Sequence, residues 1–332
     1  MHMSDALITP AVAGTMYVAS SIAAAYSINQ VRKDDSKDKV AVMGVMGAFV
    51  FATQMINFTI PATGSSGHLC GGLLLSAILG PYGGFLTMIG VLLTQCLFFA
   101  DGGLLALGCN IWNMAFYGCF IGALLIWRPI MKNGATKGKI ILASILGSVI
   151  TLQLGAFSVC VETLISGVSE LPFSTFLLTM QPIHLAIGFV EGLITAAVLC
   201  FIHEVRPQLL WGVNNSEDKQ SRLSFRTTMA IMAGLTVAVG GLLSLYASAF
   251  PDGLEWSMEK VAGTSELEAE GALYTLADKI QSFFSFLPDY AFKGSESALG
   301  TTVSGIVGCL IVALICFVAS KLLRFFKGKA NA

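Results

Sequence analysis

Two of the four histidines in the sequence stand where nitrogen donors for a metal ion could gather. His2 directly follows Met1, and a large residue at position 2 normally protects the initiator methionine, so we expect a free Met1 amine. The amine, the His2 backbone nitrogen and the His2 Nδ1 can then close adjacent five- and six-membered chelate rings around one ion. His68 is the candidate for a fourth nitrogen, and Asp5 for a side chain that orients a ligating ring.

Four nitrogen donors in a plane have a definite metal preference. A square of nitrogens suits Ni²⁺ or Cu²⁺, whereas Zn²⁺ tends to avoid that geometry. His68 ends a loop, residues 57–68, whose Pro, Gly and Ser content is typical of an ordered, non-helical segment that dips into a cavity. Asn57, Ser65 and Ser66 are the candidates within the loop for supporting the site. Binding would release protons from the donors, so the affinity should fall below neutral pH.

Simpler roles fit the same two histidines. Position 2 also suits an ordinary solvent-exposed residue, and His68 also suits a helix-capping residue at the membrane interface. The residue types alone therefore leave the metal site as one of two interpretations.

A second polar pair lies within a predicted helix over 178–204. His184 and Glu191 are seven residues apart, about two helical turns, and so share one face of that helix. Ionisable residues inside a membrane are functional candidates by default. The pair fits a role near the metal, the relay of a proton-coupled secondary metal transporter, or plain hydrogen bonding to each other or to a loop backbone.

Small residues mark one face of a predicted helix over 40–57. Gly44, Ala48 and Ala52 recur every four positions, which makes a flat face on which another helix can pack closely. Such a face fits contact with a helix of a partner protein, and it equally fits packing inside the chain.

The composition predicts the elements that must position these residues. The chain is 55% hydrophobic and 12% charged, whereas soluble proteins carry roughly a quarter charged residues. Several apolar runs reach the roughly 20 residues that a membrane-crossing helix needs. We predict an all-α integral membrane protein of about nine transmembrane helices, at about 11–30, 40–57, 69–83, 85–100, 104–127, 140–166, 178–204, 228–250 and 300–323.

The basic residues predict the orientation in the membrane. Sixteen of the 19 Lys and Arg form four groups of four, and the positive-inside rule assigns all four groups to the cytoplasm. The N-terminus then lies outside and the C-terminus inside, in a multi-pass protein of the cell inner (plasma) membrane. The groups lie within 32–39, 128–139, 206–226 and 321–329.

A polar stretch predicts two fused modules. Residues 1–205 (the first module) hold seven of the predicted helices, residues 206–227 form a cytoplasmic linker, and residues 228–332 (the second module) hold two. Between those two helices, an extracytoplasmic segment over 251–298 carries nine acidic residues and three lysines. Its role is open: it could recruit cations, gate loop movement or form a solvated face.

No sequence motif supports an enzyme, so catalytic residues are not expected. Gly138-Lys139 lacks the glycine spacing of a phosphate-binding loop, and His203-Glu204 lacks the second histidine of a metalloprotease motif. Any ATP must therefore be hydrolysed by another chain.

Five groups of residues carry a likeness to a known family: Met1-His2 with Asp5, residues 54–58 and 63–69, residues 101–108 with Asn110 and 113–114, His184 with Gly188, 191–192 and Thr195, and residues 251–255. They resemble the CbiM/NikM family, the substrate-specific membrane subunits of energy-coupling-factor (ECF) cobalt and nickel importers. The resemblance covers nearly the whole chain, and the last stretch is similar to the PDGLE signature of the small CbiN or NikN type partner subunit. The opening departs from the family pattern at Ser4 and Ala6, so we expect the N-terminal turn to differ from the family's.

The resemblance implies a seven-helix ECF S-component-like bundle plus a two-helix module. It implies that Met1, His2 and His68 bind one Ni²⁺ or Co²⁺ as transported substrate, with no permanently bound cofactor. It also implies a transmembrane coupling subunit (T component) and two ATPase subunits as partners, together with membrane lipid and no nucleic acid. A proton-coupled transporter and a scaffold that only assembles the importer are the alternatives.

Overall fold

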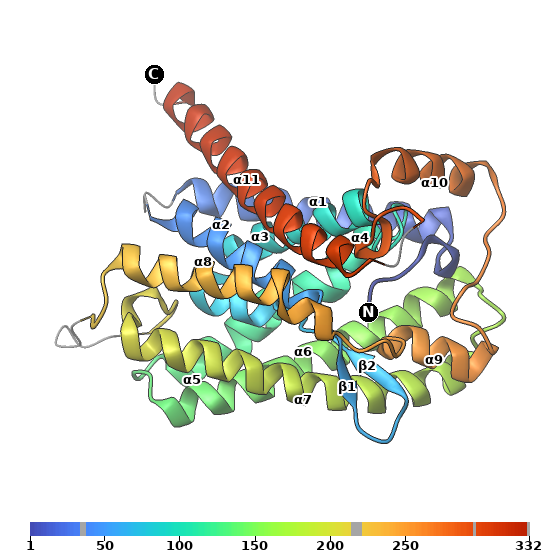
Figure 1. Cartoon of the computed structure of the whole chain (residues 1–332), viewed down its shortest axis with the longest axis horizontal. Helices are drawn as coiled ribbons and strands as arrows, with labels where there is room; N and C mark the ends of the chain where they lie inside the picture. Colours follow the sequence, from blue (N-terminus) through green and yellow to red (C-terminus); the bar gives the residue numbers. More distant parts are fainter. Residues whose placement is uncertain (34–37, 214–220, 295–296, 331–332) are drawn as a thin grey trace.

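The computed structural model describes residues 1–33, 38–213, 221–294 and 297–330, with side chains as far as Lys321. The described part is a helical bundle in which seven helices are long and apolar enough to cross a membrane (Figure 1). The prediction of an all-α membrane protein is confirmed. The seven are α1 (Pro10–Arg32), α3 (Gly72–Phe99), the helix Leu107–Met131 that contains α4 (Leu107–Asn110) and α5 (Arg128–Met131), α6 (Lys137–Ser166), α7 (Phe173–Val205), the helix Phe225–Tyr246 that begins with α8 (Phe225–Gly241), and α11 (Ala298–Ala330).

The predicted helices over 69–83 and 85–100 are two arms of α3. Gly80 leaves the helical conformation, with φ 76° and ψ 167°, directly before Pro81. A side-chain carbon added at Gly84 would lie 2.9 Å from the Ser76 backbone, whereas eight residues of straight helix span about 12 Å. The chain therefore reverses at Gly80, and both outer ends of α3 come to the same end of the bundle.

The second module packs against α2 (Lys39–Gln54), a 16-residue apolar helix. Helices α8 and α11 both lie along α2, and the small face is buried between them. Gly44 faces Ala313 of α11, and Ala52 faces Gly240 of α8. Of the two interpretations of Gly44, Ala48 and Ala52, the structure matches packing inside the chain rather than contact with a partner protein, because the chain's own helices use the close approach that small residues permit.

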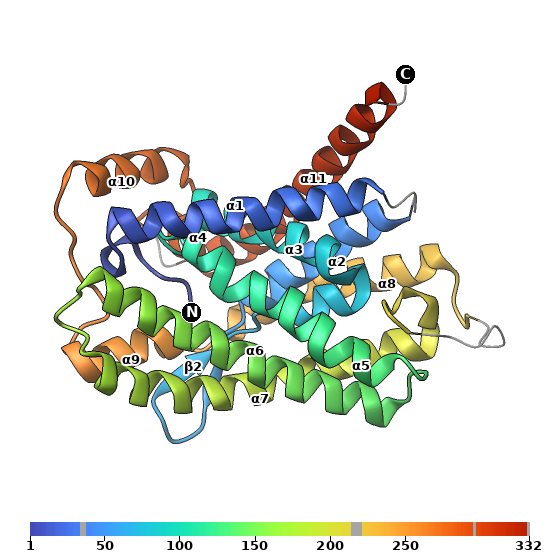
Figure 2. The same cartoon turned by 180° about the vertical axis from the view of Figure 1, so that it is seen from behind.

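Basic residues gather at the end of the bundle that holds the α3 turn. Lys39 lies against Gly83, Arg128 lies against Gly212, and the Trp211 N–H donates to the Ala77 carbonyl at 2.8 Å. The N-terminus lies inside the bundle, in the half toward the opposite end (Figures 1 and 2). This arrangement agrees with the orientation predicted from the positive-inside rule. Of the predicted linker, residues 214–220 lie outside the described residues.

The end of the bundle with the N-terminus carries the non-helical elements. Strands β1 (Phe58–Ile60) and β2 (Ser65–Gly67) pair antiparallel, with Thr59 opposite Ser66. Helices α9 (Gly253–Ala262) and α10 (Ala272–Phe284) of the second module lie at this same end, and α9 contacts both β2 and α7 (Figure 2). The hairpin therefore lies between the two modules.

Candidate metal-binding site

The amino-terminal segment is held in place by hydrogen bonds at Met3, one residue beyond His2. The Met3 N–H donates to Asn110 Oδ1 at 2.8 Å, and Asn110 Nδ2 donates back to the Met3 carbonyl at 3.1 Å. The Gly103 N–H donates to the same carbonyl at 2.9 Å. Because Met3 is fully buried, these bonds leave Met1 and His2 as a short arm that extends into the bundle.

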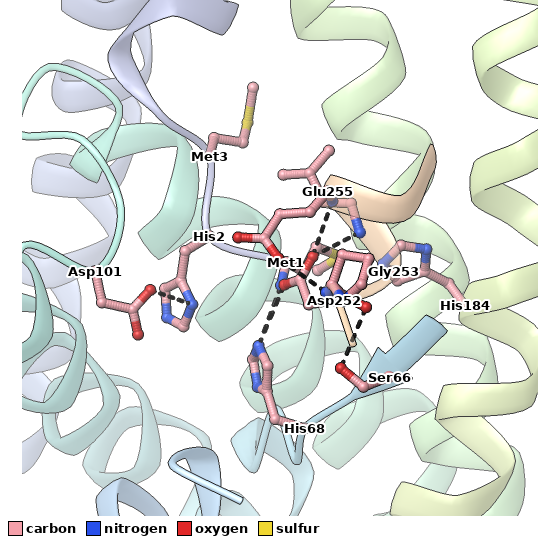
Figure 3. A network of polar contacts seen from close by, with 12 residues as sticks. Met1, His2, Met3, Ser66, His68, Asp101, His184, Asp252, Gly253 and Glu255 are labelled. Carbon is pink, nitrogen blue, oxygen red and sulfur yellow. Dashed lines mark hydrogen bonds and ion pairs between the residues drawn. The ribbon is translucent and has the colours of Figure 1, made fainter. Parts of the chain in front are cut away.

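The Met1 amino group meets His68 inside the protein (Figure 3). The amino nitrogen lies 3.1 Å from His68 Nε2, although 67 residues separate them in sequence. His68 Nδ1 lies 3.1 Å from the Leu69 carbonyl, which fixes the proton on Nδ1 and leaves the Nε2 lone pair facing the amine. The structure therefore brings together two of the three predicted ligand residues through nitrogens that can bind a metal.

The His2 ring lies beside this pair but faces another way. Its plane stacks on the His68 ring with centroids 5.2 Å apart. Its Nδ1 lies 3.0 Å from Asp101 Oδ1, and its Nε2 lies 3.2 Å from Gln95 Oε1. The predicted chelate ring through Nδ1 is therefore not closed, because Asp101 and Gln95 offer hydrogen-bond partners on the far side of the ring. Closing the ring requires the imidazole to rotate away from Asp101.

Burial keeps the His2 ring available as a donor. Loss of hydration lowers the pKa of His2 to about 4, against the attraction of Asp101 and with help from the nearby amino group. A neutral ring at physiological pH carries one lone pair, which is the form that binds metals. Asp101 and Gln95 were not among the predicted site residues, although Asp101 begins the Asp101-Gly102-Gly103 stretch that the sequence marked.

The second module contributes an acidic residue to the site. Asp252 Oδ2 forms an ion pair with the Met1 amino group and lies 3.7 Å from His68 Nε2. Burial alone would raise the pKa of Asp252, but the amino group and His68 outweigh it and hold this pKa well below the ordinary value. Asp252 is thus an anion at neutral pH. Its place in the PDGLE stretch was the only sequence signal for it.

Asn57, Ser65 and Ser66 support the loop by contacting the second module or the loop itself. The Asn57 carbonyl accepts from the Ser248 N–H at 2.7 Å, on the β1 side of the hairpin. On the β2 side, the Ser66 N–H donates to the Pro251 carbonyl at 2.8 Å, and its Oγ donates to the Phe250 carbonyl at 2.7 Å. The Ser65 N–H bonds within the loop, to Thr63 Oγ1. The three residues therefore stabilise the conformation of the 57–68 loop and hydrogen-bond it to the second module.

Asp5 has a different role from the predicted one. Its Oδ1 accepts the Ala106 N–H at 2.9 Å, so it anchors the start of the chain to the segment before α4. The expectation that Asp5 orients a ligating ring is wrong, and Asp101 occupies that place beside His2.

His184 and Glu191 are both buried and bond different parts of the backbone. Glu191 accepts the N–H groups of Cys70 and Gly71, at 2.9 and 3.0 Å, and so fixes the chain where His68 leads into α3. His184 Nδ1 bonds the Met180 carbonyl at 2.7 Å. The Glu191 contacts match the alternative of bonding to a loop backbone, whereas His184 bonds its own helix through Nδ1 and its buried Nε2 has no hydrogen-bond partner among the described residues. The two side chains do not bond each other and do not form a relay.

An acidic cavity opens onto the site from the extracytoplasmic segment. Its volume is about 740 Å³, and His2 and His68 lie in its wall. Six carboxylates line it, from both modules: Asp5, Asp101, Asp252, Glu255, Asp278 and Asp289. The acidic residues of the segment thus do not all form an outward solvated face.

Side chains alone do not make a complete metal centre. Across residues 1–33, 38–213, 221–294 and 297–330, no three His, Cys, Asp or Glu side chains gather closely enough to hold an ion. The potential donor next to His68 Nε2 is instead the nitrogen of the Met1 amino group. A metal site that used this nitrogen would be sensitive to any change at the start of the chain.

Comparison with known proteins agrees with this arrangement. Residues 2–209 match the family model described as the cobalt uptake substrate-specific transmembrane region, and residues 226–325 match the PDGLE domain. The chain is 32% identical to the fused nickel transport protein NikMN of Archaeoglobus fulgidus, over 98% of this chain and 99% of that one. It is 28% identical to the fused nickel transport protein LarMN of Lactiplantibacillus plantarum, over 95% and 96%.

Two solved structures of transition metal transporters share the fold. One, a truncated form, is 29% identical with a TM-score of 0.54, covering 61% of this chain and 99% of its own. The other is 28% identical with the same TM-score, covering 62% and 93%. The chain therefore belongs to the CbiM family of cobalt and nickel transport proteins, in the form that carries a PDGLE domain in the same polypeptide.

Proposed function

We propose that this protein captures one Ni²⁺ or Co²⁺ ion from outside the cell and delivers it for import. The ligands are the Met1 amine, the His2 backbone nitrogen, His2 Nδ1 and His68 Nε2. One observation carries the proposal: the Met1 nitrogen and His68 Nε2 lie 3.1 Å apart. Two nitrogens at a right angle, each about 2.0–2.1 Å from one metal ion, lie about 2.9 Å apart.

Metal binding requires one local change. The His2 ring turns from Asp101 toward the amine, and the ring, the amide nitrogen and the amine then close the two chelate rings. The anchor at Met3 need not move, because its bonds to Asn110 and Gly103 lie beyond the chelate. Both nickel and cobalt accept such nitrogen donors.

We propose further that this chain is the substrate-binding subunit of an ECF-type importer. A T component and two ATPase subunits would supply the energy, since the sequence itself holds no phosphate-binding loop. The named relatives are transport proteins for nickel or cobalt, which supports the cargo. Partner-driven reorientation in the bilayer would then release the ion inward.

Metal titration of the purified full chain tests the capture site. His68→Ala, His2→Ala and a one-residue N-terminal extension should each weaken Ni²⁺ binding by about 100-fold or more, because second-sphere changes already cost 10–100-fold. His203→Gln, near the opposite end of the bundle, is the matched histidine control and should bind as the unaltered chain does. If all three altered chains and the control bound Ni²⁺ as tightly as the unaltered chain, the proposed site would be wrong.

Uptake by proteoliposomes tests the energy source. Accumulation of ⁶³Ni²⁺ should require the T component, both ATPases and ATP. ATP-independent uptake by this chain alone would contradict the importer and favour a secondary transporter. If the unaltered chain binds no metal while still assembling the partners, the scaffold interpretation replaces both.

A further inference from the structure

The two carboxylate oxygens of Asp252 have separate partners. Oδ1 accepts the N–H groups of Leu254 and Glu255, at 2.8 and 3.0 Å, and so caps the start of α9. Oδ2 faces the Met1 amino group and His68 Nε2 (Figure 3). Because the cap fixes Oδ1, the side chain cannot rotate without losing the helix start. Oδ2 is therefore held beside the two nitrogens.

The backbone that carries Asp252 is fixed as well. The preceding carbonyls of Phe250 and Pro251 accept bonds from Ser66, and Trp256 Nε1 donates to the Thr63 carbonyl at 3.0 Å. Gly253 passes so close to α7 that an added side-chain carbon would lie 3.1 Å from His184 Nε2. The Asp252 carboxylate can leave the site only if residues 250–252 separate from the β1–β2 hairpin.

The negative charge on Asp252 Oδ2 determines its role at the site. In the structure Oδ2 neutralises a single positive charge, that of the amino group. A dication held by the amine, the deprotonated His2 amide and His68 would lie within a few ångströms of the same oxygen, and the loaded site would carry a net positive charge of one. The carboxylate can therefore neutralise the loaded site as it neutralises the amino group in the structure, because opposite charges attract at this short distance.

We propose that Asp252 is the anionic partner of the transported ion, contributed by the second module to a site whose nitrogen ligands all belong to the first. It raises the affinity for divalent ions and links the docked second module to the loaded state. The inference rests on the proposed function, because it assumes that the ion binds at the Met1 amine and His68.

Asp252→Asn in the full chain is the direct test, with Ni²⁺ affinity measured by titration in detergent. Asparagine is an equally good helix cap, so the variant keeps the start of α9 and removes the charge. We expect the affinity to fall by about tenfold or more. The loss should persist in 0.5 M salt, because salt screens exposed charges far more than buried ones.

Glu255→Gln is the matched control. It removes the same charge from the same turn of α9, and glutamine can keep the bond from the Asp252 N–H that Glu255 accepts at 2.9 Å. Its affinity should stay within twofold of the unaltered chain. Equal weakening by both substitutions, abolished by salt, would show a general acidic surface and overturn the proposal.

Asp252→Glu distinguishes the loss of the negative charge from a separation of residues 250–252 from the hairpin. Glutamate keeps the charge on a longer side chain, so it should recover most of the affinity that Asp252→Asn loses. Equal weakness of both variants would assign the effect to shape and overturn the proposal. Binding by Asp252→Asn as tight as or tighter than that of the unaltered chain would also overturn it, because Asp252 would then compete with the ion for the amine.

The failures of the two proposals are distinguishable. If the unaltered chain does not bind Ni²⁺, or if His68→Ala binds normally, the proposed function fails. If the unaltered chain binds through His68 and Asp252→Asn is unaffected, only the role of Asp252 fails.

Discussion

The bundle has a cluster of charged pairs at each end, and the two clusters differ in burial. At the outer end, the side chains of Met1 and Asp252, whose amino and carboxylate groups pair, are 4% and 13% exposed. At the inner end, Glu204 pairs with Lys137 and Arg222 at 2.9 and 2.8 Å, with all three side chains between 41% and 70% exposed. Water and salt weaken the inner pairs, whereas the outer pair is less exposed to both. The N–O distance of an ion pair therefore does not show how much the pair contributes to stability.

Asp252→Ala should have the largest effect on stability. It removes one partner of a buried ion pair and the cap of α9, so we expect a loss of about 3 kcal/mol in the free energy of unfolding. Thermal unfolding in detergent, without added metal, measures this. An unfolding temperature equal to that of the unaltered chain would mean that the outer pair is no stronger than the inner ones.

Gly253→Ala should have the next largest effect. The added methyl group would lie 2.7 Å from Ile187 Cδ1 and 3.1 Å from His184 Nε2, and such overpacking costs about 1–3 kcal/mol. The same unfolding measurement applies. Gly234→Ala on α8 is the control, because nothing lies within 4 Å of the added carbon there.

Two tryptophans allow a direct comparison of the ends. Trp256→Phe removes the Nε1 bond to the Thr63 carbonyl at the outer end, and Trp127→Phe removes the Nε1 bond to the Trp211 carbonyl at the inner end. Each should lower stability by about 1 kcal/mol. Only Trp256→Phe should also weaken Ni²⁺ binding, by a few fold, because it loosens the loop that ends at His68. Equal metal affinity in the two variants would contradict the link between docking and binding.

Glu204→Gln should have the smallest effect. It ends both inner ion pairs, yet the unfolding temperature and the Ni²⁺ affinity should not change measurably, since these side chains are exposed. A large drop in the unfolding temperature would show that the inner cluster is a structural centre after all.

The candidate ligands of the first module could be named from the sequence for a covalent reason. The amine, amide and ring of Met1 and His2 are only a few bonds apart, so a chelate is within covalent reach whatever the fold. His68 could be named as a candidate because its Gly- and Ser-rich loop favours a non-helical segment. The turn at Gly80 within α3 lies near the boundary predicted between the helices over 69–83 and 85–100, where Gly and Pro interrupt the apolar run.

What the sequence could not reveal are the contacts between distant segments. Nothing in the composition shows which of nine acidic residues in 251–298 reaches an amino group 251 positions away. The direction of the His2 ring depends on Asp101 and Gln95, which come from other elements. The small face of α2 was recognisable, but whether the chain's own helices or a partner's would cover it depends on tertiary packing.

The contact between the β1–β2 hairpin and residues 250–252 of the second module has a kinetic consequence. Both parts belong to one polypeptide, joined through residues 206–227. A short tether gives its two ends an effective concentration on the order of millimolar. Docking of the second module onto the hairpin is therefore a first-order event, independent of how many copies the membrane contains. Two separate polypeptides would have to reach a comparable density in the bilayer before most copies of the first module carried a docked second module.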